Sequence, residues 1–462
     1  MAFDGEAGPV KVFAPTGALG MGFLDASLAR AIEWQPDVIA CDAGSTDSGP
    51  SHLGGAIPKM SDAAIYRDLS RLLKARDQLG VPLIIGSCGT AGTDSGVDWT
   101  ADIARRIASE TGLTFKLTCI YSEQDGAQLA ERWAAGGIAP LPGAPDVTAE
   151  TFRGCDHVVA MMGAEPIQAA LTDGADVILT GRASDTALFA ALPLMRGLPP
   201  GPVWHCAKTI ECGAVCSSVS RADGMLAVID ETGFSIEPAA DDAIATPLGI
   251  AAHTLYENAD PFLIREPAGT LDTTAARYTQ LDARTTRVEG STFRHEPYTL
   301  KLEGAVPVGY QTVVIGGIRD PLIIKQLDPW FAEMRAFFAE RAEELTGLKL
   351  GDRLLLDIKI YGRDAVMGDD EPAPVPASEV GVMFTVTAPT QAIANDTARF
   401  VAHVASHWPI AEWDGFISGI AYPFSPPEID RGKAWRFALH HVVQDVDPLE
   451  LVRFKSEVVG AA

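Results

Sequence analysis

The sequence predicts an α/β fold in which an N-terminal, Rossmann-like domain built on a parallel sheet is followed by a smaller α+β C-terminal domain. Three observations predict it. Short β-branched apolar runs alternate with helical segments through the first half of the 462 residues. These runs are largely apolar, as strands buried on both faces require. After a stretch rich in proline and glycine at residues 192–202, the alternation gives way to a different pattern.

The strand and helix candidates of the first half follow each other in a regular order. Residues 61–79 carry apolar side chains at helical spacing, and residues 98–111 form a second helical segment. A repeated order of strand, helix and strand indicates parallel pairing with right-handed crossovers. The expected strands are residues 11–14, 37–41, 82–85, 116–120, 157–161 and 176–179.

The second half is predicted to contain a connecting region and a separate C-terminal unit. Residues 227–237 have the pattern of an antiparallel pair, and residues 328–346 have that of one amphipathic helix. Strand-like residues 353–361 and 380–388, followed by a helix at 390–407, indicate an α+β unit. We therefore expect an α/β substrate-binding and catalytic domain at 1–240, a mixed connecting region at 241–350 and an α+β domain at 351–462.

Composition and charge exclude several classes of partner. Lys and Arg number 36 against 61 Asp and Glu, so the formal net charge is −25, which repels nucleic acid and anionic membrane surfaces. There is no apolar run of about 18 residues and no signal-peptide pattern at the N-terminus. The seven cysteines are odd in number and form no Cys-x-x-Cys motif, which fits reduced thiols. We expect a cytoplasmic homo-oligomer.

Polar and glycine residues gather directly after three of the expected strands. In open parallel sheets, ligands bind beyond the carboxyl ends of the strands. Glycine lets the backbone approach a ligand, and the N–H groups at helix starts favour anions. A strand-to-helix turn also carries glycine and an N-cap Ser or Asp for geometry alone, so that alternative stands beside the functional one. The expected substrate-binding residues are Gly44, Ser45, Thr46, Asp47, Gly89, Thr90, Gly181 and Ser184.

Four residues are the catalytic candidates: Arg182, Asp185, Glu211 and Cys212. Arg182 would hold a substrate carboxylate through two parallel hydrogen bonds. Glu211 or Asp185 would move a proton, and backbone N–H groups of the glycine loops would stabilise an enolate-type oxyanion. This chemistry favours a lyase, namely a hydratase or dehydratase, acting on a small carboxylate or acyl-CoA. An alternative for Glu211 is that it only pairs with Lys208.

The sequence contains no standard cofactor-binding motif. Neither Gly-x-Gly-x-x-Gly nor a Walker A lysine motif occurs, which argues against a standard dinucleotide or P-loop site. The carboxylates of Asp42, Asp47 and Asp94 are ligands that suit magnesium, so either magnesium or no cofactor is expected. The His and Cys residues within 205–216 match no common zinc spacing.

Six separated stretches occur here in the same order as in a known family. They are DAGSTDSGP (42–50), DVILTGRASD (176–185), IECG (210–213), IYGRDAVMG (360–368), APTQAIAN (388–395) and AYPFSP (421–426). Through nearly its whole length the sequence resembles the acyclic terpene utilisation family, the AtuA-like proteins. The family takes its name from genes that degrade terpenoids, while its own chemical step is not defined. Some members carry an extra small C-terminal domain and others a separate small protein that resembles it, so the resemblance implies a small partner subunit as an option.

Two alternatives to the lyase stay open from the sequence. One is a non-catalytic subunit of a two-component complex, which would present its acidic surface and C-terminal unit to a partner enzyme. The other is a hydrolase that uses Cys212 as its nucleophile, which requires a cation nearby to lower the pKa of the thiol. His205 and Lys208 are the neighbouring candidates for that cation.

Overall fold

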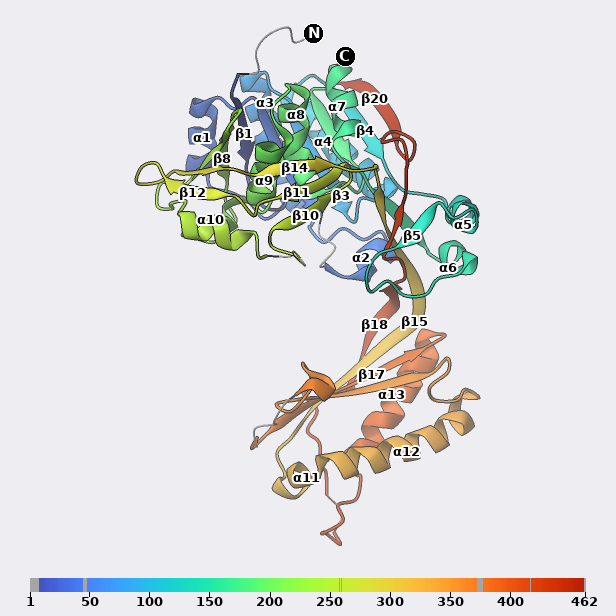
Figure 1. The fold of residues 1–462 in the computed structure, drawn as a ribbon. Coiled ribbons are helices and arrows are strands. Elements are labelled where there is room, and N and C mark those ends of the chain that lie inside the picture. The colour runs from blue at the N-terminus through green and yellow to red at the C-terminus, as the bar shows by residue number, and fades with distance from the viewer. Residues whose placement is uncertain are drawn as a thin grey trace. The chain divides into compact units, whose positions relative to one another are not determined.

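The computed structural model describes residues 8–44, 48–256, 258, 260–371, 377–415 and 417–460. The chain forms two compact units, whose elements are labelled in Figure 1. Unit 1 comprises Met1–Val306 with Phe437–Ala462, and unit 2 comprises Pro307–Arg436. The division does not fall at the expected residues 240 and 350, because the chain on both sides of residue 240 contributes strands to one sheet.

Unit 1 is built on a ten-stranded sheet whose centre is parallel, in the order β1-β2-β3-β7-β4. Each of these strands hydrogen-bonds to its neighbours in parallel register. Five of the six expected strands of the first half therefore do lie side by side in one parallel segment. They are β1 (Val10–Ala14), β2 (Val38–Gly44), β3 (Leu83–Thr90), β7 (Val177–Thr180) and β4 (Phe115–Tyr121).

Antiparallel strands extend this sheet at both edges, so it is mixed and not parallel throughout as expected. On one side β8 pairs with β1, and the hairpin of β8 and β9 confirms the antiparallel pair predicted at 227–237. On the other side β20, from the C-terminal end of the chain, pairs with β4. The edge strands are β8 (Met225–Ile229), β9 (Gly233–Pro238), β13 (Thr286–Glu289), β12 (Arg277–Gln280) and β20 (Arg453–Val459).

The sixth expected strand belongs to a different sheet. β6 (His157–Met161) pairs antiparallel with the first part of β15 (Leu300–Ile318), and β15 also pairs there with β19 (His441–Val443). β19 in turn pairs with β5 (Ile138–Pro140). A short apolar run indicates a strand but not its partner, which is why the prediction for residues 157–161 was wrong about the sheet.

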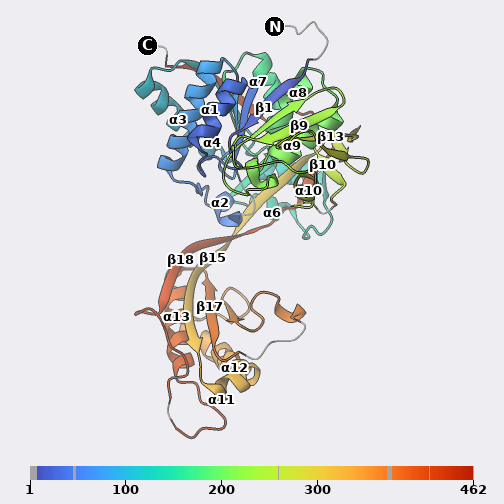
Figure 2. The same cartoon turned by 90° about the vertical axis from the view of Figure 1, so that its left-hand side faces the viewer.

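Helices cover both faces of the ten-stranded sheet. Successive residues of β2 point to opposite faces, so Val38 and Ala40 belong to one core and Ile39 to the other. The first core is completed by α7, α8 and α9, and the second by α1, α3 and α4, which lie on opposite sides in Figure 2. The bounds are α1 (Asp25–Trp34), α3 (Asp62–Leu79), α4 (Asp94–Thr111), α7 (Glu165–Thr172), α8 (Asp185–Met195) and α9 (Pro200–Ile210).

A three-stranded antiparallel sheet, in the order β10-β11-β14, packs on α9. The ring of Trp204 on α9 stacks on that of Phe293 on β14, with 5.8 Å between the centroids. This small sheet places residue 266, the last of β10, beside α8. The remaining elements of unit 1 are β10 (Leu263–Glu266), β11 (Gly269–Asp272), β14 (Thr292–His295), α2 (Pro50–Gly54), α5 (Gly126–Ala134), α6 (Ala149–Arg153) and α10 (Pro247–His253).

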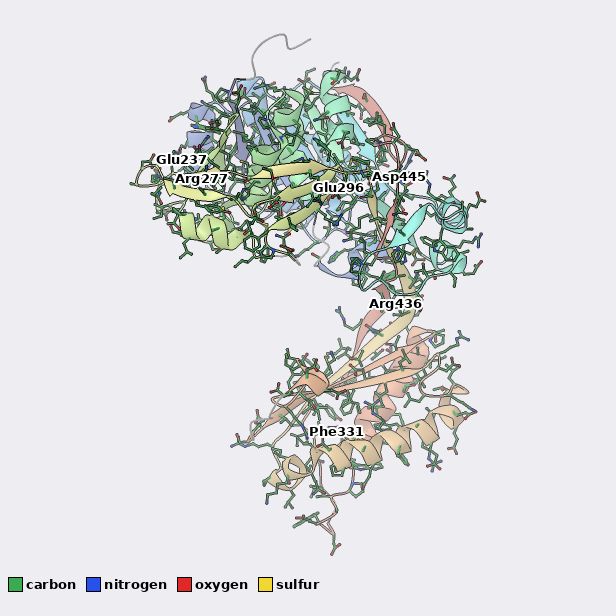
Figure 3. All side chains as sticks on the ribbon, viewed as in Figure 1. Glu237, Arg277, Glu296, Phe331, Arg436 and Asp445 are labelled. Atoms are coloured by element: carbon green, nitrogen blue, oxygen red, sulfur yellow. The ribbon has the colours of Figure 1, made fainter. Side chains whose placement is uncertain are left out.

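Unit 2 is an α+β layer structure. The second part of β15 pairs antiparallel with β17, which pairs with β16, and β18 pairs with β15. Phe331 of α12, labelled in Figure 3, and Phe384 of β17 lie in its core. The elements are α11 (Pro321–Lys325), α12 (Leu327–Thr346), β16 (Leu355–Tyr361), β17 (Val380–Ala388), α13 (Gln391–Ser406) and β18 (Glu428–Phe437). Among the described residues of both units, no helix combines the length and apolar character needed to cross a membrane.

Candidate active site

A cavity of about 630 Å³ lies in unit 1, at the carboxyl ends of β2, β3 and β7. Gly44 and Thr90 are the last residues of β2 and β3, and Arg182 follows β7. The end of α9 and the end of β10 complete the wall. The polar lining residues include Asp42, Gly44, Thr90, Arg182, Ser184, Asp185, Thr186, Lys208, Glu211, Cys212 and Glu266.

Most of the predicted site residues therefore come together. The catalytic candidates Arg182, Asp185, Glu211 and Cys212 all line this one cavity, as do Gly44, Thr90 and Ser184 from the substrate-binding set. Ser45, Thr46 and Asp47 lie outside the described residues. Gly89 and Gly181 are not among the lining residues.

Gly89 and Gly181 have a packing role. A Cβ atom on Gly89, whose φ is +70°, would lie 2.4 Å from the Cα of Gly96, and one on Gly181 would lie 2.6 Å from Oγ of Ser122. The N–H of Gly181 donates to the carbonyl of Ile120 at 2.6 Å. The N–H of Gly44 donates to Oδ2 of Asp42 at 2.9 Å. Both N–H groups already donate within the protein, so neither is available to the oxyanion that the glycine loops were expected to stabilise.

The end of β3 adopts a strained backbone at the cavity. Ser87 and Thr90 have φ values of 44° and 80°, in the left-handed region that residues with a Cβ rarely adopt. Such strain concentrates at functional sites. The turn brings the Ser87 hydroxyl to the β7–α8 loop, where it accepts hydrogen bonds from Nη1 of Arg182 at 3.1 Å and from the N–H of Ala183 at 3.3 Å. The backbone of β3 thereby fixes the position of Arg182.

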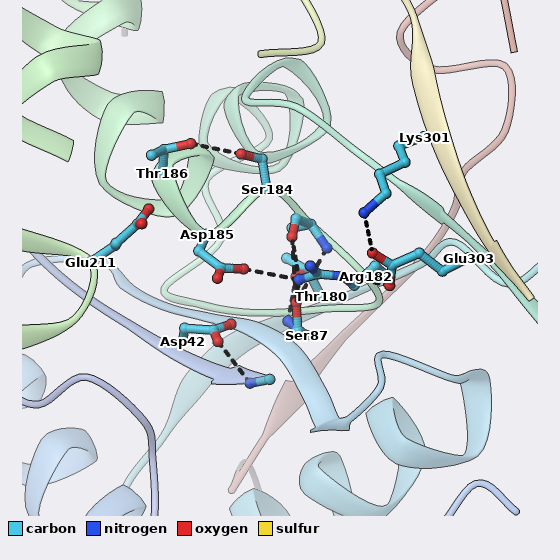
Figure 4. Close-up of polar contacts among 12 residues, drawn as sticks. Asp42, Ser87, Thr180, Arg182, Ser184, Asp185, Thr186, Glu211, Lys301 and Glu303 are labelled. Carbon is cyan, nitrogen blue, oxygen red and sulfur yellow. Dashed lines mark hydrogen bonds and ion pairs between the residues drawn. The ribbon is translucent and has the colours of Figure 1, made fainter. Parts of the chain in front are cut away.

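Arg182 is the centre of a buried charge network, which Figure 4 shows. It is only 7% exposed. Its Nε donates to Oε2 of Glu303 at 3.1 Å, and its Nη1 donates to Oδ1 of Asp185 at 2.9 Å. Although burial opposes a charge, the nearby carboxylates raise the pKa of Arg182, so it stays cationic. A substrate carboxylate could take the predicted two-point grip on Arg182 only by displacing these partners.

Glu211 and Lys208 form a buried ion pair at the end of α9. The ammonium of Lys208, one helical turn before, donates to Oε1 of Glu211. Burial raises the pKa of Glu211 to about 8, and the neighbouring carboxylates of Asp185 and Glu266 add to that rise, while Lys208 opposes it. The pair predicted as an alternative therefore exists, and it lies inside the cavity. A carboxyl group that titrates near neutral pH is suited to accept and return a proton.

Glu266 is a site residue that the sequence analysis missed. It is buried, and it accepts hydrogen bonds from the hydroxyls of Ser184 and Thr186, both at 2.7 Å. Burial raises its pKa to about 7, although these two hydrogen bonds favour the anion. Glu266 follows no glycine-rich loop and lies in the region expected only to connect two domains, so no local pattern marked it.

Asp42 is the fourth carboxyl group of the cavity. It is 3% exposed, and its Oδ2 is held by the N–H of Gly44. No described residue forms a hydrogen bond with its Oδ1. Burial raises the pKa of Asp42 well above its usual range, with a further contribution from Asp185 and an opposing one from Arg182.

Of the three carboxylates expected to hold a metal, Asp42 lines the cavity, Asp94 does not, and Asp47 lies outside the described residues. Asp94 lies outside the cavity lining, where its Oδ2 pairs with Arg453 at 2.6 Å and its N–H donates to Glu123. His205 is buried, and its Nδ1 shares a hydrogen bond of 2.5 Å with the hydroxyl of Ser291. Over the described part of the chain, no cluster of three or more His, Cys, Asp and Glu side chains has the geometry of a metal site.

The mouth of the cavity differs in character from its interior. Met21 and Val215 are exposed there, next to Ile264. Lys59 and Arg265 line the same cavity with exposed side chains, and Arg265 pairs with Glu296 at 3.1 Å. The interior is thus acidic, while the mouth is apolar and basic.

Comparison with known proteins settles the family. Residues 62–196 and 226–415, most of the chain, match the acyclic terpene utilisation family protein AtuA. The chain belongs to the AtuA family. The resemblance inferred from the six motifs is confirmed by this match. Comparison with curated proteins and with solved structures found no match. In this AtuA-family chain the matched ranges include Arg182, Asp185 and Glu266, whereas Asp42 and Glu211 lie outside them.

Proposed function

We propose that this AtuA-family chain is a cytoplasmic hydro-lyase, a hydratase or dehydratase, acting on a small carboxylic acid or its acyl-CoA thioester. One observation carries the proposal. A single cavity holds several buried carboxyl groups, two of which, Glu211 and Glu266, have pKa values raised to about 8 and about 7. Buried groups with perturbed pKa values in a cleft are the usual mark of acid–base chemistry.

Glu211 is the base in this proposal. When it is ionised, Lys208 holds and stabilises its carboxylate. The carboxylate accepts the proton from the carbon next to the substrate carbonyl, and the electron pair of that C–H bond forms the C=C bond. The C–O bond to the hydroxyl group on the next carbon breaks, and the oxygen leaves as water after it receives a proton. Hydration is the same sequence in reverse.

The other polar residues position the reacting groups. Asp185 is held by Arg182, which is itself fixed by Glu303 and Ser87. The hydroxyl groups of Ser184 and Thr186 hold Glu266 in the wall. Since the cavity wall is built before substrate arrives, little reorganisation is needed during the reaction.

The test uses the purified chain and mass spectrometry. The chain is incubated with β-hydroxybutyrate and with β-hydroxybutyryl-CoA, and the products are examined for the loss of one water. We expect turnover by the wild type and loss of turnover in Glu211→Gln, while Asp98→Asn, a carboxylate on α4 outside the cavity, stays active. Wild-type activity that survives unchanged in Glu211→Gln would contradict the proposal.

A Cys-dependent hydrolase is the second candidate function. Cys212 lines the cavity and is partly exposed, and its charge interacts with that of Lys208. A thiolate beside an ammonium group is a competent nucleophile. Alkylation of Cys212 with iodoacetamide separates the two candidates, because full activity after complete modification excludes the thiol as nucleophile.

A non-catalytic role in a two-component complex is the third candidate, which the family resemblance motivates. In that case the chain alone converts no substrate, and adding its small partner restores turnover. The same incubation therefore tests it, and turnover by the isolated chain rules it out.

A further inference from the structure

The cavity contains one buried oxygen atom that nothing in the described part of the chain satisfies. Asp42 lines the cavity, and its Oδ1 is buried and receives no hydrogen bond there, although Oδ2 of the same carboxyl group accepts the N–H of Gly44 at 2.9 Å. A buried polar atom without a partner costs about 1–3 kcal/mol, more when it is charged. Folded proteins contain few such atoms, and a catalytic role is one of the explanations for those that occur.

The charges around Asp42 explain its state. Asp185 and Arg182 both act on it, and Arg182 is shared with Glu303 and Asp185. Lys301 also pairs with Glu303, at 3.2 Å, so two cations face three carboxyl groups and neutralise only part of their charge. Because its Oδ1 has no partner among the described residues and an anion lies nearby, the protonated form of Asp42 is favoured over the carboxylate. The O–H group of the protonated Asp42 can then donate a hydrogen bond to an acceptor.

We propose that Asp42 is a second catalytic residue, the acid that protonates the leaving hydroxyl group, and that the substrate is an uncharged hydroxy-carbonyl compound such as a thioester. This inference rests on the hydro-lyase function proposed above. Glu211 at the end of α9 and Asp42 at the end of β2 line the same cavity, and Asp185 interacts electrostatically with both. Two carboxyl groups in different surroundings thus take the two different roles.

The step is balanced. Glu211 accepts the proton from the carbon next to the carbonyl, and that electron pair forms the C=C bond. The C–O bond breaks, its electron pair stays on oxygen, and Asp42 donates its proton so that water leaves. The cavity ends with one proton on Glu211 and one proton fewer on Asp42, and solvent exchange restores the starting state.

The same charges favour an uncharged carbonyl group. The interior cations are Arg182 and Lys208, and each already forms an ion pair with a carboxylate of the protein. Four carboxyl groups line the interior, so a substrate carboxylate there would meet like charges, and both interior cations are already paired. The exposed side chains of Lys59 and Arg265 are at the mouth, where a negatively charged carrier group would be accepted instead.

The test separates proton donation from proton removal by changing the leaving group. The probes are the N-acetylcysteamine thioesters of β-hydroxybutyrate and β-chlorobutyrate, since chloride leaves without a proton and hydroxide does not. Asp42→Asn retains a group that can accept the N–H of Gly44. We expect this variant to lose the hydroxy reaction by about 10²–10⁴-fold while it keeps the chloro reaction within a few fold of wild type. Glu211→Gln loses both, and Asp98→Asn loses neither.

Each outcome has one meaning. Equal losses of the two reactions in Asp42→Asn, or no loss in either, would overturn the assignment of Asp42 while a wild-type enzyme that releases water leaves the proposed function standing. Turnover of free β-hydroxybutyrate but not of its thioester would overturn the substrate class. If the wild type converts neither form, the proposed function itself fails. Thermal unfolding of each variant checks that a loss of activity is not a loss of fold.

Discussion

A cavity and a groove lie at opposite ends of the same parallel strands. Both contain aspartates, but the hydrogen-bond partners of these aspartates differ. The cavity at the carboxyl ends holds Asp42, and a groove of about 570 Å³ at the amino ends holds Asp37, only five residues before it on the chain. In the groove, Oδ1 of Asp37 pairs with Arg196 at 2.7 Å and Oδ2 accepts the N–H of Lys11 at 2.8 Å. Both oxygens of Asp37 are satisfied, whereas only one oxygen of Asp42 is.

The second carboxylate of the groove repeats the pattern. Oδ1 of Asp176 pairs with Arg76 at 2.9 Å, and its Oδ2 accepts the N–H of Lys116 at 2.8 Å. Carboxylates of this kind tie strands and helices together. In the cavity, by contrast, Asp42 is buried and no described residue forms a hydrogen bond with its Oδ1, which makes this carboxyl group costly to the fold and available for chemistry. Whether both carboxyl oxygens have partners therefore distinguishes the structural charges of the groove from the reactive ones of the cavity.

The largest expected effect is on activity. Glu211→Gln removes the base and should lower turnover by about 10²–10⁴-fold. Asp176→Asn, in the groove, should leave turnover unchanged because it lies at the other end of the strands. Steady-state rates of the two variants make the comparison, and an equal fall in both would contradict the distinction between the cavity and the groove.

Arg182→Ala should cause the largest loss of stability. It removes the guanidinium from the buried carboxylate of Glu303, which retains its ion pair with Lys301 at 3.2 Å, and it frees Asp185. Because Lys301 still compensates part of the charge of Glu303, the expected cost is about 3 kcal/mol, the lower end of the range for a broken buried pair. Arg76→Ala breaks a pair whose partner, Asp176, is 41% exposed, so water replaces part of the lost interaction and the cost is smaller. Urea unfolding measures both, and a greater loss in Arg76→Ala would contradict the burial argument.

The stability of the fold should fall as pH rises. The fold favours the protonated forms of Glu211 and Glu266, since burial raises their pKa values to about 8 and about 7 from 4.5. Their contribution is therefore complete below the pKa of the unfolded chain and is lost as pH rises through those two values. Glu266→Gln should remove about 3 kcal/mol of this pH dependence. Thermal unfolding across the range measures it, and an identical slope in wild type and variant would refute the shift.

The smallest expected effect compares Asp42 of β2 with Asp37, which directly precedes that strand. Asp42→Asn removes a buried group that has an unsatisfied oxygen, so at alkaline pH the variant should be more stable than wild type by about 1 kcal/mol, as often happens when an active-site residue is replaced. Asp37→Asn removes a paired carboxylate and should be less stable than wild type. Melting temperatures decide the signs, and a destabilised Asp42→Asn would mean that its carboxylate is structural.

Much of the cavity could be predicted because local sequence patterns indicate which strands are parallel. Apolar runs that alternate with helices specify parallel strands, and parallel strands bring Gly44, Thr90 and Arg182 to one sheet edge whatever the details of packing. The glycine pattern was less informative, because Gly89 and Gly181 serve close approaches between backbone segments and leave no mark that separates this role from ligand binding.

The rest depends on contacts between segments far apart in the sequence. Arg182 was expected to hold a substrate, but it is occupied by Glu303, which lies 121 positions along the chain. Glu266 reaches the site because a small sheet packs on α9. No pattern in the residues next to Glu266 predicts this packing. The edge strand β20 returns from the C-terminal end to pair with β4, which a reading of consecutive elements does not anticipate.

The central claim is that this cavity holds protonated carboxyl groups at neutral pH, and infrared spectroscopy tests it without a substrate. Difference spectra between wild type and Asp42→Asn at pH about 7 should contain the C=O stretch of a carboxylic acid, which the variant lacks, because Asp42 is buried, its Oδ1 has no hydrogen-bond partner among the described residues, and burial raises its pKa. The matched spectra for Asp37→Asn should show the loss of a carboxylate band instead. A carboxylate band for Asp42 as well would contradict the account.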